Sequence, residues 1–293
     1  MFRNILFAVA SLCVATAAHA QVTESARAYS PADCPSCAGW NEPTRPVHLF
    51  GNTYYVGTRG LASILVVSPD GHVLIDGGLP ESAPLILQNI QALGFRAADV
   101  KFIVNSHEHY DHAGGIAALQ RATGARVLVS EASAPVLRRG LPGPDDPQHA
   151  IALAMPAVSN VEAAPPGHVL ALGSLQLTMH ATGGHTPGGT SWSWKSCEAE
   201  RCLDFVYADS QSPISQDEFR FSDRPRLVTA FREGHALLER ISCDVLITPH
   251  PGASQLWKRA QTAPEGLIDP DACKRYATSA RLQLDNRLAL ERP

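Results

Sequence analysis

The stretch Ser106-His107-Glu108-His109-Tyr110-Asp111-His112 places three histidines and an aspartate within six residues. An apolar run typical of a buried strand precedes it. His107 and His109 alternate, so an extended strand end directs both imidazoles to the same side. Asp111 and His112 follow where the chain turns towards a helix. Because zinc binds imidazole nitrogen and carboxylate oxygen, this spacing predicts two ligand pairs for two adjacent metal ions.

Two further histidines lie in loops that follow strand-like segments. His185 belongs to the glycine-rich run Thr182-Gly183-Gly184-His185-Thr186-Pro187-Gly188-Gly189, and His250 to Thr248-Pro249-His250-Pro251-Gly252. Rigid scaffolds usually present catalytic groups on such loops, so both histidines are candidate ligands. The settings of six other histidines are typical of surface or packing residues: His48, His72, His149, His168, His180 and His235.

A structural zinc site in a non-catalytic protein is the alternative from another functional class. Structural sites close with four ligands, often thiolates, whereas a catalytic zinc keeps one position open. The cysteines of this chain lie outside the histidine-rich stretches. The pattern therefore favours an enzyme.

The rest of the chain alternates strand-like and helix-like segments, which predicts one α/β domain with sheets inside and helices outside. Predicted strands cover 54–57, 63–67, 73–76, 102–104, 126–129, 175–179, 191–194, 205–207 and 245–247. Predicted helices cover 84–93, 225–241 and 272–290. Residues 140–148 are rich in Gly, Pro and Asp and predict a long surface loop. Trp192 and Trp194 are predicted to pack in the core.

The N-terminus has the pattern of a secretory signal peptide. Arg3 supplies the positive charge, Ile5 to Val14 form an apolar stretch too short to span a bilayer, and Ala18-His19-Ala20 fits the cleavage rule. We therefore expect a signal peptide over 1–20 and a mature domain over 21–293, which would be periplasmic or secreted.

Six cysteines remain after the predicted cleavage, and an oxidising compartment favours their pairing as disulfides. Cys197 and Cys202 flank a short polar turn and are expected to close a hairpin. Cys243 and Cys273 would form a bridge that stabilises the fold by about 3–4 kcal/mol in the chain-entropy model. For Cys34 and Cys37 a local disulfide is favoured, because a redox motif needs a following helix and a zinc ribbon needs a second pair, neither of which the sequence indicates.

Composition excludes several classes of partner. The chain has 293 residues, 45% of them hydrophobic, and a formal charge of -4, which argues against nucleic acid binding. Outside the signal peptide no stretch is apolar enough to span a membrane. We expect a monomer that acts on a small molecule.

The H-x-H-x-D-H run, the later G-H-T-P-G and the late T-P-H-P-G resemble the metallo-β-lactamase superfamily, over nearly the whole mature chain. The details resemble subclass B3: His112 follows Asp111, a serine stands where other subclasses have a cysteine ligand, and Cys243 and Cys273 bracket the last histidine loop. The resemblance implies a single-domain αβ/βα four-layer sandwich with two Zn²⁺ at the sheet edges.

The resemblance also implies residue roles. His107, His109 and His185 would bind the first zinc, and Asp111, His112 and His250 the second. A zinc-bound hydroxide, oriented by Asp111, would hydrolyse the amide bond of β-lactam antibiotics. Ser210 and Ser212 would bind the substrate carboxylate, with ordinary loop serines as the alternative.

Two residues leave alternatives open. Glyoxalase-like and lactonase-like hydrolases of the superfamily bridge their metals with an aspartate in the region of Asp209. We favour a role for Asp209 in orienting a ligand or the neighbouring backbone. Gln148, at the end of the long loop, is a further candidate for the site.

Overall fold

The structure is a computed structural model that describes residues 34–292, so the predicted signal peptide lies outside the described residues. Two β-sheets form its centre. The first sheet contains, in spatial order, β1 (Val47–Phe50), β2 (Thr53–Tyr55), β3 (Ile64–Ser68), β4 (Gly71–Ile75), β5 (Val100–Val104), β6 (Arg126–Ser130) and β7 (Val161–Ala164). The second contains β12 (Val245–Ile247), β11 (Arg201–Tyr207), β10 (Thr190–Glu198), β9 (Leu175–Ala181) and β8 (Val169–Leu172).

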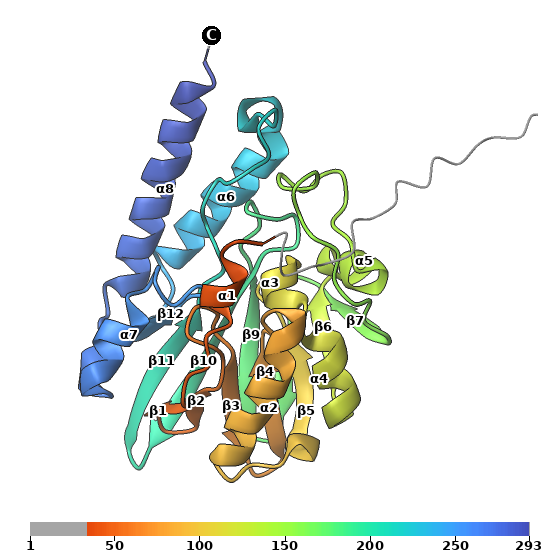
Figure 1. Cartoon of the computed structure of the whole chain (residues 1–293). Coiled ribbons are helices and arrows are strands. Elements are labelled where there is room, and N and C mark those ends of the chain that lie inside the picture. The colour runs from red at the N-terminus through yellow and green to blue at the C-terminus, as the bar shows by residue number, and fades with distance from the viewer. Residues whose placement is uncertain (1–33, 293) are drawn as a thin grey trace, which may run out of the picture.

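The helices flank the two sheets (Figure 1). They are α1 (Cys37–Trp40), α2 (Ala83–Ala92), α3 (Tyr110–Ala113), α4 (Ile116–Thr123), α5 (Ser133–Arg139), α6 (Pro225–Leu238), α7 (Leu256–Arg259) and α8 (Ala272–Leu290). Side chains of α2, α4 and α5 share a buried cluster with the first sheet. Helices α6 and α8 cover the second sheet, where Leu238 and Ala277 pack against Val206 and Leu246. The predicted single-domain α/β fold with outer helices is confirmed.

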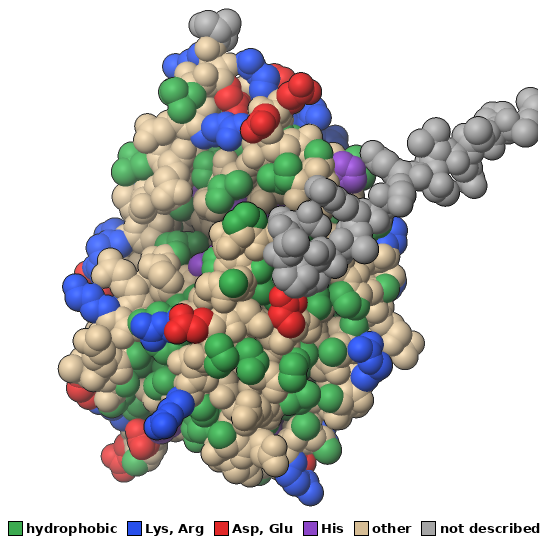
Figure 2. Space-filling model, in the orientation of Figure 1, with side chains coloured by type: hydrophobic (Ala, Val, Ile, Leu, Met, Phe, Trp, Pro, Cys, Tyr) green, Lys and Arg blue, Asp and Glu red, His purple; other side chains and the backbone are tan. Residues whose placement is uncertain are grey.

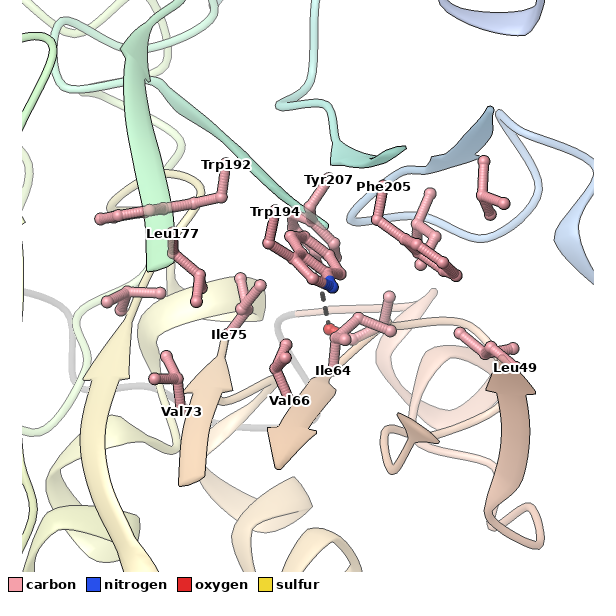
Figure 3. Close-up of a cluster of buried hydrophobic side chains, with 14 of the residues drawn as sticks. Leu49, Ile64, Val66, Val73, Ile75, Leu177, Trp192, Trp194, Phe205 and Tyr207 are labelled. Atoms are coloured by element: carbon pink, nitrogen blue, oxygen red, sulfur yellow. Dashed lines mark hydrogen bonds between the residues drawn. The ribbon is translucent and has the colours of Figure 1, made fainter. Parts of the chain in front are cut away.

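The main core lies between the two sheets. Figure 3 shows side chains from β3 and β4, among them Ile64 and Ile75, facing aromatic side chains of β10 and β11. Trp192 is fully buried there, and Trp194 donates a hydrogen bond from Nε1 to Thr53 Oγ1 at 2.9 Å. The predicted packing role of both tryptophans is therefore confirmed.

Several elements were missing from the prediction. Strands β1, β7 and β8 have only four residues each, and their mixtures of exposed and buried positions give a weak pattern. Helices α4 and α5 are also short, with eight and seven residues. The segment 140–148 is not wholly on the surface as expected, because Asp146 is buried.

The six described cysteines form the three predicted disulfides. Cys197 and Cys202 face each other across the β10–β11 hairpin, and Cys243 joins the start of α8 through Cys273. Cys34 pairs with Cys37, and the short helix α1 begins at Cys37, although the sequence indicated no helix there. No described helix is long and apolar enough to cross a membrane.

The disulfides lead to a first prediction. Thiol titration of the mature protein, unfolded without a reductant, should detect about zero thiols, because all six cysteines are paired. Full reduction before the titration is the control and should reveal six. Two or more reactive thiols in the unreduced sample would contradict the pairing.

Candidate metal centre

The predicted ligands gather at the carboxyl ends of strands from both sheets. The histidine-rich stretch follows β5, His185 follows β9, and His250 follows β12. A backbone hydrogen bond from Thr190 N to Ser106 O, 2.6 Å long, connects the two sheets beside the site. Ligand sites in α/β folds commonly lie outside the carboxyl ends of strands.

Three histidines form the first group. The candidate ligand atoms of His107, His109 and His185 all lie within 4.8 Å of one another, and all three residues are buried. Their ring centroids are 4.9–5.0 Å apart. This arrangement allows three imidazole nitrogens to share one metal ion and leaves a fourth position open.

The second group consists of Asp111, His112 and His250. Asp111 Oδ2 lies 3.1 Å from His112 Nε2 and 3.3 Å from His250 Nε2, and the two Nε2 atoms are 3.3 Å apart. The His112 ring lies next to that of His107, with 4.3 Å between the centroids, so the two groups adjoin. The structure thus brings together all six residues predicted as ligands.

In each histidine of the first group, one ring nitrogen lies close to a protein oxygen atom. Asp209 Oδ1 is 2.8 Å from His107 Nδ1, Asp146 Oδ2 is 3.1 Å from His109 Nε2, and the Ser212 carbonyl oxygen is 2.9 Å from His185 Nδ1. His107 Nε2 is buried without a hydrogen-bond partner. An imidazole held at one nitrogen, with the other free, is the usual arrangement of a metal ligand.

Charge gives a second test of whether metal ions fit. Six acidic side chains are buried in the described part of the chain, and five of them belong to this region: Asp76, Glu108, Asp111, Asp146 and Asp209. No lysine or arginine is buried among the described residues. Buried charges need compensation, which two divalent cations would supply. The donor set and the charge therefore both fit a dinuclear metal site.

Burial also sets the protonation of two of the ligands, His107 and His185. It lowers the pKa of His107 well below its usual value, with a further contribution from the neighbouring His112. Burial and His109 lower the pKa of His185 to about 3. Both imidazoles are therefore neutral near pH 7, which is the form that binds metals. For Asp209 burial raises the pKa strongly, an effect that nearby cations would oppose.

Sequence reasoning missed three of these carboxylates, Asp76, Glu108 and Asp146. Asp146 also accepts a hydrogen bond from Gln148 N at 2.7 Å, and it brings the long loop to His109. Asp76 follows β4 with a φ of 62° and receives hydrogen bonds from Ser106 and Tyr207, while its Oδ2 lies 3.8 Å from His112 Nδ1. Such contacts join distant parts of the chain and leave no local spacing signal.

A cavity of about 860 Å³ reaches the second group at His250, the one candidate ligand in its lining. Its lining includes Ser210, Ser212 and His250, and it continues towards α7 and α8. Figure 2 shows a hollow on this face with a histidine side chain visible inside it. Gln148 also reaches the site, with Nε2 3.4 Å from His185 Nε2. The cavity therefore offers space for a small molecule next to His250 and both predicted substrate serines.

Comparison with known proteins agrees with this geometry. The profile of the metallo-beta-lactamase superfamily matches residues 56–199. The structure of the Rm3 metallo-beta-lactamase is 51% identical, with a TM-score of 0.86, over 88% of this chain and 98% of that one. MEM-A1, a subclass B3 metallo-beta-lactamase isolated from a soil metagenome library, is 46% identical with a TM-score of 0.84, over 86% of this chain and 98% of that one.

A curated relative matches a shorter part. The hydroxyacylglutathione hydrolase of Anaeromyxobacter dehalogenans is 35% identical over 122 residues, which are 42% of this chain and 37% of that protein. The chain thus matches less than half the length of this relative. From the fold, the site and the full-length structural matches, the chain belongs to the metallo-β-lactamase superfamily of hydrolases. Within the superfamily it belongs with the subclass B3 enzymes.

Proposed function

We propose that the protein is an exported β-lactamase that depends on two zinc ions per chain. The observation that carries this proposal is the convergence of six ligands in two adjoining groups of three, with a cavity that His250, Ser210 and Ser212 help to line. The predicted signal peptide and the three disulfides support export.

Each part of the site has a role in this proposal. His107, His109 and His185 would hold one zinc, and Asp111 with two further ligands, His112 and His250, would hold the other. Zinc at these positions would supply a Lewis acid and a nucleophile at neutral pH. Asp111 would also orient the nucleophile. The carboxylate of Asp209 keeps the His107 ring in place through the 2.8 Å contact with Nδ1.

Substrate recognition is proposed to rest on the two serines that line the cavity. Ser210 and Ser212 lie on the segment that follows β11. The same segment contacts His185, because the Ser212 carbonyl oxygen lies close to His185 Nδ1. Their hydroxyls would donate hydrogen bonds to the ring carboxylate of a β-lactam. The net positive charge of a site loaded with zinc would favour such an anionic substrate.

Replacing both serines tests this recognition. Ser210→Ala combined with Ser212→Ala should raise KM for β-lactams by a few-fold to tens of fold, corresponding to about 1–2 kcal/mol for lost hydrogen bonds to a charged group. The zinc content should stay unchanged, because neither serine belongs to a ligand group. An unchanged KM would show that the carboxylate binds elsewhere.

Thioester hydrolysis is the second candidate, because hydroxyacylglutathione hydrolases are among the relatives. The deciding experiment compares hydrolysis of a penicillin, a carbapenem, a glutathione thioester and a lactone by the zinc-loaded protein. We expect the two β-lactams to be hydrolysed with much higher kcat/KM. A preference for the thioester or the lactone would overturn the proposal while leaving membership of the superfamily intact.

A further inference from the structure

Glu108 lies between two of the metal-ligand candidates, His107 and His109, and beyond its negative charge it has been given no role so far. Its side chain is 1% exposed. The carboxylate accepts three hydrogen bonds: from Gly188 N at 3.0 Å, Thr186 Oγ1 at 2.9 Å and Ser133 Oγ at 2.8 Å. A buried carboxylate with three donors forms strong, charge-assisted hydrogen bonds.

Two of these donors belong to the loop that presents His185. Thr186 follows His185 directly, and Gly188 is two residues further along. The first group is supplied by two segments, the strand end with His107 and His109 and the loop with His185. Glu108 belongs to the first segment and is hydrogen-bonded to the second. These segments are about 80 residues apart in the chain, since the contact from Gly188 N spans 80 positions. Their relative position depends on tertiary contacts of this kind.

The shape of the loop supports the same connection. A Cβ atom at Gly188 would lie 2.5 Å from Glu108 Oε2 and 2.2 Å from Ser133 Oγ. The same Cβ would lie 2.8 Å from the backbone nitrogen of Ser133, so a larger residue at this position would have to shift the loop away from Ser133 and the carboxylate. The close approach of Glu108 and Ser133 thus explains why a residue without a side chain follows His185-Thr186-Pro187.

We propose that Glu108 is a positioning residue for the first metal. It fixes the loop that carries His185 against the strand end that carries His107 and His109, and its charge offsets part of the charge of the bound cation. This inference rests on the proposed assignment of the three histidines to one zinc. Among the described contacts, Glu108 accepts no hydrogen bond from a residue of the second group.

The test measures zinc affinity of each site separately. His250→Ala weakens the second site, so competition with a chromophoric chelator in this background reports the first site. In the same way, His185→Ala weakens the first site, so chelator competition in that background reports the zinc affinity of the second site. Glu108→Ala should weaken zinc binding at the first site by about 10–100-fold, the range for groups that orient metal ligands, and change the second site less than twofold.

Two milder variants keep the test valid if Glu108→Ala folds poorly. Thr186→Val removes one donor at nearly constant volume and should weaken the first site by a few-fold. Glu108→Gln keeps an acceptor for Gly188 N, and the hydroxyls can turn to accept from its amide, so its loss should be smaller than that of Glu108→Ala.

Glu291→Ala is the matched control. Glu291 is the sixth buried acid of the described chain and lies outside the metal region; its carboxylate accepts hydrogen bonds from Phe221 N and Ser222 N. We expect this variant to lower the Tm of the metal-free protein without changing either zinc affinity. Glu108→Ala with the same behaviour, or with equal weakening of both sites, would overturn the inference. Failure of the unmodified protein to bind zinc would overturn the proposed function and this inference together.

Discussion

His185→Ala should reduce kcat/KM for β-lactams by at least about a thousandfold, equivalent to about 4 kcal/mol of transition-state stabilisation. The side chain supplies one of three nitrogens to the first group, and two remaining histidines hold zinc much less well. Metal analysis of the dialysed protein should find close to one zinc per chain, against two in the unmodified protein. Both measurements are needed, because a loss of activity alone has many causes.

His180→Ala is the control for this variant. His180 is on β9, in the strand that leads to the His185 loop, and its Nε2 contacts Ser193 Oγ at 2.8 Å. It belongs to neither ligand group. Zinc content and activity should therefore remain close to those of the unmodified protein. Two zinc ions and high activity in His185→Ala would refute the assignment of the first group.

Asp209→Asn is expected to reduce metal affinity or activity by about 10–100-fold without emptying the site. The carboxylate contacts His107 Nδ1 at 2.8 Å and lies outside both ligand groups. It is fully buried, and a Cβ on Gly189 would lie 2.4 Å from its Oδ2, so the glycine-rich loop packs directly on it. An amide of the same size keeps this packing and changes the charge and hydrogen bonding to His107.

The same variant distinguishes the two hydrolase types of the superfamily. A carboxylate that bridges two metals contributes charge to both, so its replacement would release both zinc ions. Elemental analysis of dialysed Asp209→Asn decides between these outcomes. Loss of both metals, together with a preference of the unmodified protein for thioesters or lactones, would contradict the subclass B3 function proposed above.

The ligands were predictable because their signal is local. His107, His109, Asp111 and His112 lie on one strand end and the following turn, where spacing alone sets direction. The late His250 could be found because the short strand β12 precedes a loop rich in proline and glycine. The same reasoning identified the long helices, whose apolar positions repeat over several turns.

The supporting carboxylates could not be predicted in this way. Asp146 lies in a Gly- and Pro-rich segment that resembles a surface loop, yet it is 2% exposed and contacts His109. Asp76 directly follows a strand, a position where aspartate is common because turns favour it. Nothing in the sequence around Glu108 indicates that three donors surround its carboxylate. Their roles depend on contacts between segments 30 to 80 residues apart, which the fold creates.

Zinc titration of the metal-free protein, followed by hydrolysis of a penicillin and a carbapenem, tests the central claim most directly. The account predicts no hydrolysis without metal, a rise in activity as zinc is added, and no further rise beyond two equivalents per chain. This expected stoichiometry follows from the proposed assignment of the six converging ligands to two metal ions. Hydrolysis that persists in excess chelator, or a protein with two bound zinc ions that hydrolyses neither β-lactam, would contradict the account.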